Sequence, residues 1–355
     1  MAADSAILAA ARAIKSADFV LVAAGAGFSA DSGLPVYADV AEHPAYARRS
    51  LTYHDLCRPE LLVEDPRLFY GFWGDCLARY RSTSCHEGYA ILDRWLSQKP
   101  DGQTYIYTSN VDGHFRRWPV LRQRLHEIHG CLEEWMCSSS MGFLYDDGER
   151  IERSGDFWAL HRSACQQRRE ALRHGTDGPP SAIACETFKE AAPADFAFQV
   201  NADSMLAELP DTDADEDAAE HSNATWATRP PRCPCCSGPL RPAVLLFNDL
   251  DATLCHWLKD AGDVYQAWEE RMEVQAEKHA ARVVILELGC GVRVPSVRRE
   301  CESVLDDTLT RGGDALLVRV NPEFSENDSC PEHTISISDS ALHALRLIDE
   351  ALNDL

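Results

Sequence analysis

Several short apolar runs along the chain end in glycine or polar residues. The first, Phe19 to Ala24, lacks the alternation of polar and apolar residues that a half-exposed strand shows. A run of this kind predicts a strand that is buried on both faces, as in a parallel sheet. The further strands that the pattern predicts cover Tyr105 to Ser109, Val244 to Phe247, Val283 to Leu288 and Leu316 to Val320.

Between these runs, apolar residues recur at helical spacing. At the amino end, Ile7, Leu8, Ala11 and Ile14 fit one helical face. Strand, glycine turn, helix and strand then recur, which predicts an α/β fold with a doubly wound parallel sheet. The further predicted helices cover Leu68 to Leu77, His86 to Leu96, Asp260 to Ala281 and Ala341 to Leu352.

The first apolar run breaks into Gly25-Ala26-Gly27, and Ser29 and Ser32 follow. Glycines permit a tight turn and let backbone N–H groups approach a ligand closely. Such a turn at the carboxyl end of a strand is the usual site for the pyrophosphate of a dinucleotide. By itself, the pattern fits a plain strand-to-helix turn equally well.

Polar residues also follow the second predicted strand. Asn110 and Asp112 stand where α/β folds place ligand contacts. The alternative is an Asx-turn that caps the next helix. His129 follows closely enough for one βα unit to bring the three residues together, although a lone histidine is more often structural.

The stretch from Cys137 to Arg232 has few apolar runs and contains an acidic tract, which is typical of an insertion with a solvated loop. Directly after it, Cys233 and Cys236 form a C-x-x-C knuckle that suits tetrahedral zinc. Cys137 is the natural third ligand, whereas Ser140 stands where a second knuckle needs cysteine. The alternatives are an empty site or a fourth ligand from Cys131, Cys165, Cys185 or Cys235.

The composition and the net charge of the chain argue against several classes of function. The chain has 355 residues, 45% of them hydrophobic, and a net charge of −23. This charge argues against binding to nucleic acid or to anionic membranes, and it is compatible with basic, lysine-rich partners. No apolar run reaches the roughly 18 residues of a transmembrane helix, and the amino end lacks a signal-peptide pattern. We therefore expect a cytoplasmic protein, or a nuclear one in a eukaryote, whose 14 cysteines are mostly buried thiols together with metal ligands.

Taken together, these motifs resemble those of the sirtuins, the NAD-dependent protein deacylases. The resemblance implies a Rossmann-like NAD-binding domain in two parts, residues 1–130 and 241–355, with a zinc-ribbon-like module and the insertion in 131–240. Six blocks match in order: GAGFSADSGLP, TSNVDG, EIHG, CPCCSGPLRPAVLLF, GCGVRVP and VNPE.

The resemblance also assigns roles to residues. His129 matches the general base, and Asn110 and Asp112 match the contacts to the nicotinamide ribose and amide. Cys137, Cys233 and Cys236 match zinc ligands. The remaining matches to NAD-binding positions are Gly25, Ala26, Gly27, Ser29 and Ser32 beside the phosphates and ribose, and Gly289, Cys290, Val294, Asn321 and Glu323 on the adenosine side.

The chain departs from the family pattern at several motifs. Val36 to Asp39 replaces Pro-Asp-Phe-Arg, so Tyr37 stands for the phenylalanine and the arginine is absent. Ser109 replaces a glutamine, and Phe247-Asn248-Asp249 replaces Phe-Gly-Glu. Gly289-Cys290-Gly291 replaces Gly-Thr-Ser, and the first zinc knuckle is half lost.

Three functions remain open at this stage. The first is a lysine deacylase that transfers the acyl group of a protein or peptide to ADP-ribose and releases nicotinamide. The second is an ADP-ribosyltransferase or NAD glycohydrolase, in which another nucleophile or water captures the same activated carbon; the altered Asn248-Asp249 motif favours it. The third is a non-catalytic sensor of NAD or ADP-ribose, which would not need His129 as a base.

Overall fold

The computed structural model describes residues 2–36, 39–138, 145–146, 149–150, 188–192, 199–209, 231, 233 and 239–355. The chain forms two compact units. The first contains Met1–Val40, Arg79–Gly130 and Leu258–Leu355, and the second contains Ala41–Ala78 and Cys131–Trp257. The predicted boundaries differ from this division, because 41–78 and 241–257 belong to the second unit.

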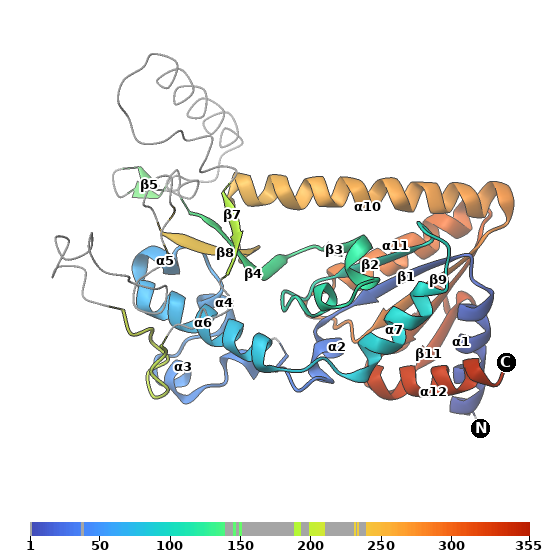
Figure 1. Cartoon of the computed structure of the whole chain (residues 1–355), viewed down its shortest axis with the longest axis horizontal. Helices are drawn as coiled ribbons and strands as arrows, with labels where there is room; N and C mark the ends of the chain where they lie inside the picture. Colours follow the sequence, from blue (N-terminus) through green and yellow to red (C-terminus); the bar gives the residue numbers. More distant parts are fainter. Residues whose placement is uncertain are drawn as a thin grey trace, which may run out of the picture. The chain divides into compact units, whose positions relative to one another are not determined.

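A six-stranded parallel sheet forms the centre of the first unit, which confirms the predicted doubly wound, Rossmann-like α/β fold (Figure 1). The strand order is β11-β10-β9-β1-β2-β3. The chain therefore builds outward from β1 in both directions, and the order reverses between β1 and β9. The strands are β1 (Phe19–Ala24), β2 (Thr104–Thr108), β3 (Leu125–Glu127), β9 (Arg282–Leu288), β10 (Asp314–Val320) and β11 (Thr334–Ile337).

Helices cover both faces of this sheet (Figure 1). In β1, Val20 and Val22 pack with helices α1 (Ala2–Ser16), α7 (Glu87–Ser97) and α12 (Ala341–Asn353). Leu21 and Ala23 pack on the opposite face with α10 (Ala252–His279) and α11 (Ser296–Thr310). Burial on both faces is the reason why this strand shows no polar alternation. The shorter helical segments of the unit are α2 (Ala26–Ala30), η1 (Asp39–Ala41, at its boundary), η2 (His114–Arg117), η3 (Leu121–Arg124) and η6 (Pro331–His333).

The second unit contains a three-stranded sheet of order β7-β4-β8, with helical segments from 41–78. Its residues are tied together by Tyr70, whose hydroxyl donates to the Leu240 carbonyl at 2.7 Å. The elements are α3 (Pro44–Arg48), α4 (Tyr53–Leu56), α5 (Leu61–Glu64), α6 (Pro66–Ser82, whose last turn lies in the first unit), β4 (Gly130–Cys137), β5 (Tyr145–Asp146), β6 (Glu149–Arg150), β7 (Lys189–Ala191) and β8 (Leu240–Val244).

Three local predictions were wrong. Leu8 is exposed, and Ala10 takes its place on the buried face of α1. The strand predicted at Val244 to Phe247 lies earlier, at Leu240–Val244, because a turn with Asn248 at φ 58° follows it. The helix predicted from Asp260 begins at Ala252, since the Asp251 carboxylate accepts bonds from the first backbone N–H groups, those of Thr253 and Leu254.

Among the helices of the described ranges, none combines the length and the apolar character that crossing a bilayer requires.

The loops after β1 and β9 contain Gly25, Gly27 and Gly289, and they meet where the strand order of the sheet reverses, which we call the switch point. Their close contact predicts an effect of substitution on stability. Gly289 has φ +61°, and a Cβ there would lie 2.4 Å from the backbone nitrogen of Phe28. We expect Gly289→Ala to lower the free energy of unfolding by about 2 kcal/mol or more, because it adds both backbone strain and a clash with main chain. Gly291→Ala is the matched control, since a Cβ at Gly291 meets nothing within 4 Å. Urea denaturation of both variants tests this, and equal stability of the two would contradict it.

Candidate functional site

The loops after β1 and β9 pack directly against each other. The backbone N–H of Gly25 donates to the Leu288 carbonyl and that of Gly27 to the Gly289 carbonyl, each at 3.0 Å. A Cβ at Gly25 or at Gly27 would lie 2.8 Å from the Gly289 carbonyl oxygen. These two glycines are therefore required by the contact between the loops, at the point where the strand order reverses and where open α/β sheets bind ligands.

A buried polar network joins the β1 loop to the β2 loop. The Asn110 side-chain amide donates to the Gly25 carbonyl at 2.9 Å and to the Ser29 hydroxyl at 3.0 Å. The Ser29 hydroxyl in turn donates to a carboxylate oxygen of Asp112 at 2.5 Å. All three side chains are buried. The predicted residues Ser29, Asn110 and Asp112 thus form one hydrogen-bonded group.

Asp112 also makes the Asx-turn that the sequence offered as an alternative. Its other carboxylate oxygen accepts from the backbone N–H of His114 at 2.8 Å, at the start of η2. The two interpretations are compatible, because a carboxylate has two oxygens and can accept several bonds.

His129 lies between β3 and β4, at the same edge of the sheet as the network. The backbone N–H of Ile128 donates to the Thr108 carbonyl at 2.9 Å, which holds this segment against the end of β2. Burial lowers the pKa of His129, opposed by a backbone hydrogen bond to Ser109. The imidazole is therefore neutral at pH 7 and can accept a proton.

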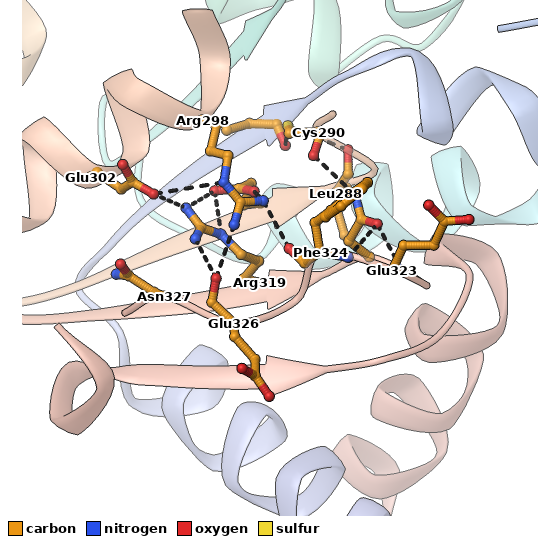
Figure 2. Close-up of polar contacts among 12 residues, drawn as sticks. Leu288, Cys290, Arg298, Glu302, Arg319, Glu323, Phe324, Glu326 and Asn327 are labelled. Atoms are coloured by element: carbon orange, nitrogen blue, oxygen red, sulfur yellow. Dashed lines mark hydrogen bonds and ion pairs between the residues drawn. The ribbon is translucent and has the colours of Figure 1, made fainter. Parts of the chain in front are cut away.

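On the other side of the switch point, Asn321 connects the loops after β9 and β10. Its amide donates to the Cys290 carbonyl at 2.9 Å, and its side-chain oxygen accepts from the N–H groups of Glu323 and Phe324 at 3.1 Å (Figure 2). The Cys290 thiol is buried in the core, so this residue presents only its backbone to the loop. Glu323 is exposed.

The other predicted site residues are more scattered. Ser32 accepts a bond from the backbone N–H of His86 at 3.1 Å, Ala26 is exposed and Val294 is half-buried. Cys137 and Cys233 are buried thiols of the second unit, and Cys236 and Tyr37 lie outside the described residues. Within the described ranges, no three histidine, cysteine, aspartate or glutamate side chains group as a metal site would need. The zinc site stays a prediction.

The model of the Sir2 family matches residues 25–175 of the chain. An NAD-dependent protein deacylase 2 of Pseudomonas aeruginosa is 33% identical over 144 residues, which cover 39% of this chain and 54% of the relative. The corresponding protein of Pseudomonas syringae pv. tomato is 34% identical over 138 residues, 38% of this chain and 53% of the relative. The matched region thus spans about half the length of these curated relatives.

The fold agrees with these matches. The crystal structure of a Sir2 homolog–NAD complex superposes with a TM-score of 0.55 at 13% identity, over 98% of this chain and 93% of that one. The chain thus matches the Sir2 family model over residues 25–175 and shares the fold of a Sir2 homolog. The predicted sirtuin resemblance is thereby confirmed.

The sequence motifs did not indicate a cluster of charged side chains beneath the loops after β9 and β10. Arg319 of β10 is fully buried and donates to Glu287 of β9 at 2.9 Å and to Glu302 of α11 at 2.8 Å. Arg298 of α11 lies 3.8 Å from the second oxygen of Glu287. We call these four residues the ion cluster. Burial raises the pKa of Glu287, although the charge and the hydrogen bond of Arg319 oppose this shift.

The ion cluster fixes the loop that follows β10. Arg298 donates to the Phe324 carbonyl at 2.8 Å and to the Glu326 carbonyl at 2.9 Å. Arg319 donates to the same Glu326 carbonyl at 3.0 Å, and Figure 2 shows both guanidinium groups directed into this loop. The cluster therefore supports the segment that carries Glu323. The only signal in the sequence is a charged residue inside each of two otherwise apolar runs.

A second buried ion pair lies in the other unit of the chain. Arg241 of β8 donates to both carboxylate oxygens of Asp249, one of them at 3.1 Å, and both side chains are buried. Asn248, next to Asp249, has φ 58°, a left-handed conformation that asparagine tolerates better than most residues. Asn248 stands where the family motif has glycine, and it therefore keeps the backbone conformation that glycine favours.

The ion cluster predicts a strong effect of removing one charge. Arg319→Met should lower the free energy of unfolding by about 3–5 kcal/mol, because it leaves Glu287 buried without its partner. Arg282 and Asp314 face each other on the same two strands at the exposed end, 3.6 Å apart. Arg282→Met is therefore the matched control and should cost less than about 1 kcal/mol. Urea denaturation measures the free energy of unfolding of both variants. Comparable losses in the two would show that burial of the ion pair does not determine its contribution to stability.

Proposed function

We propose that this Sir2-like protein is an NAD-dependent protein lysine deacylase. The observation that carries the proposal is the Ser29–Asn110–Asp112 network after β1 and β2, together with His129, whose ring has a lowered pKa and hydrogen-bonds to the backbone of Ser109 in the loop after β2. The bacterial relatives that share about a third of the aligned residues are NAD-dependent protein deacylases, which supports the same activity here. The substrate would be an acylated lysine in a protein or peptide.

The donor set fits the ribose parts of NAD. Asn110 and Asp112 would hold the nicotinamide ribose and amide, and Asn321 and Glu323 the adenine ribose, because amides and carboxylates pair well with hydroxyl groups. The N–H groups of Gly25 and Gly27 already donate to backbone carbonyls, so a diphosphate would need other donors of this loop. When bound, NAD supplies an anomeric carbon from which nicotinamide can leave as the acyl oxygen of the lysine attacks.

The residues of the chain then have separate tasks. His129 would accept a proton from a ribose hydroxyl, and its lowered pKa keeps it unprotonated for this step. Asp112 is held by Ser29 and by the His114 N–H, so its orientation is fixed before substrate binds. Preorganisation of this kind lowers the cost of reaching the transition state.

The second candidate is a glycohydrolase or ADP-ribosyltransferase. The observation in its favour is Asp249, whose carboxylate, at the altered motif, is already engaged by Arg241. Against it, Asn248 preserves the turn of the family motif. Cytoplasmic location, bound zinc and the absence of nucleic-acid or membrane partners remain predictions from the sequence.

The role of His129 is tested by His129→Ala. We expect deacylation of an acyl-lysine peptide to fall by roughly two to four decades, as for loss of a general base, with NAD affinity nearly unchanged. His279→Ala, an exposed histidine at the end of α10, is the control and should retain activity. Products are identified by mass.

The products also separate the candidate functions. Wild-type protein that forms O-acyl-ADP-ribose from NAD and the peptide supports deacylation. ADP-ribose formed without dependence on peptide supports the glycohydrolase, and NAD binding without turnover supports a sensor. Full activity of His129→Ala would remove this residue from the mechanism.

The direction of the His129 pKa shift predicts the pH dependence. The reaction needs the unprotonated imidazole, and this form is lost as the pH falls through the lowered pKa of His129. The kcat/KM for the acyl peptide should therefore stay level from about pH 8 to 6.5, the ordinary histidine pKa, and decline only below it. A half-loss of kcat/KM already at pH 7 would contradict the buried, neutral state of this side chain.

A further inference from the structure

A cavity of about 580 Å³ lies at the amino ends of the parallel strands, and the proposed function does not use it. It is bordered by residues at the starts of β1, β2 and β9, by the end of η3 before β3, and by the last turns of α10. All of these residues belong to the first unit. The glycine loops follow the carboxyl ends of the strands, so the six residues of β1, roughly 20 Å of strand, separate the two places.

Two arginine side chains line this cavity and flank Gly102. A Cβ at Gly102 would lie 3.5 Å from Nη2 of Arg271 and 3.6 Å from Nη2 of Arg124. Gly102 has φ +84°, a conformation that favours glycine, so no side chain fills the space that both guanidinium groups border. Two like charges so close together repel each other, and an anion that contacts both would offset this repulsion.

Arg271 is held in place without being neutralised. Its Nη2 donates to the Gly102 carbonyl at 3.1 Å, and the Trp268 indole donates to the same carbonyl at 2.8 Å. Within the described ranges, no carboxylate lies at ion-pair distance from Arg271. Acidic residues outnumber basic ones in the chain by 57 to 34, so an arginine without a carboxylate partner stands out. The other N–H groups of this guanidinium can therefore donate to a ligand.

Two carboxylates also border the cavity, and neither is bound to Arg271. Asp101 lies 3.3 Å from Arg124 and is 91% exposed, so this ion pair is solvated and weak. Asp18 accepts a hydrogen bond from the backbone N–H of Arg282 at 2.8 Å. A carboxylate has further lone pairs, so both can also accept from hydroxyl groups of a ligand.

Neutral polar groups complete the lining. The side chains of Gln103 and Gln275 border the cavity, and neither makes a hydrogen bond to the parts of the chain that the structure describes. A primary amide both donates and accepts, which suits hydroxyl groups. The volume falls within the range of about 300–1,000 Å³ that is typical of small-molecule sites. A ligand that matches all of these groups carries an anion and several hydroxyl groups.

We propose that this cavity is a second ligand site, which binds the phosphate monoester of a sugar. The terminal phosphate oxygens accept from Arg124 and Arg271, because the planar guanidinium fork matches the geometry of phosphate. The sugar hydroxyls donate to Asp18 and pair with the amides of Gln103 and Gln275. The arginine pair carries this inference, which does not depend on the proposed deacylase activity.

Isothermal titration calorimetry of the full chain at low salt tests the proposal, with glucose 6-phosphate, inorganic phosphate and glucose as probes. We expect glucose 6-phosphate to bind with a Kd below about 1 mM, inorganic phosphate to bind more weakly, and glucose to show no measurable binding. No binding of glucose 6-phosphate, or equal binding of glucose, overturns the proposal. Inorganic phosphate that binds as tightly as glucose 6-phosphate overturns the assignment of the sugar.

Three variants locate the binding. Arg271→Gln and Arg124→Gln should each weaken the binding of glucose 6-phosphate about tenfold, because each removes charge-assisted hydrogen bonds to phosphate. Arg122→Gln is the matched control, since Arg122 is exposed on the same 3-10 helix as Arg124 and does not border the cavity. It makes the same change in net charge and should leave the Kd nearly unchanged.

The substituted arginines are exposed or half-buried, so we expect all three variants to fold, and circular dichroism checks this. An unchanged Kd in both Arg271→Gln and Arg124→Gln overturns the assigned site. A loss of affinity in Arg122→Gln equal to that in Arg271→Gln also overturns it, because net charge would then account for the binding.

Discussion

The contact between two glycine loops is the constraint on which the rest of this protein depends. Backbone meets backbone where the loops after β1 and β9 touch, and a side chain on Gly25, Gly27 or Gly289 would occupy space held by main-chain atoms. This contact lies at the reversal of the strand order, so it determines how far apart the surrounding loops stand. These glycines are required by the packing of the loops, and the packed loops in turn position the residues of the candidate site.

Polar groups around that contact are buried, and each is held by another. Asn110 bridges the Gly25 carbonyl and Ser29, and Asp112 divides its oxygens between Ser29 and the η2 backbone. On the adenosine side, Arg319 and Arg298 anchor carbonyls of the loop after β10. A buried polar group without a partner is costly, so these networks restrict the loops to one arrangement.

The outline of the fold could be predicted because the spacing of apolar residues in each strand and helix can be read from a short stretch of sequence. Runs such as Phe19 to Ala24 lack alternation when both faces are covered, and the structure covers both. The wrong predictions arose where a helix cap or a turn overrides the spacing of the apolar residues. Asp251 starts α10 before the apolar pattern begins, and the turn at Asn248 ends β8 within an apolar run. Of the candidate site, the motifs led to Ser29, Asn110, Asp112 and His129, but not to the hydrogen bonds that join the first three.

The sequence by itself determined the sirtuin resemblance, the parallel sheet and the residues that follow its strands, because spacing along the chain encodes burial and turn chemistry. Only the tertiary structure decided which charges meet. Glu287 and Arg319 stand opposite each other through the β9–β10 register. It also decided the pKa direction of His129, since burial depends on what packs around a side chain. The neighbours of a side chain are set by the strand register and by the packing of the loops. The spacing of residues along the chain does not specify either of these.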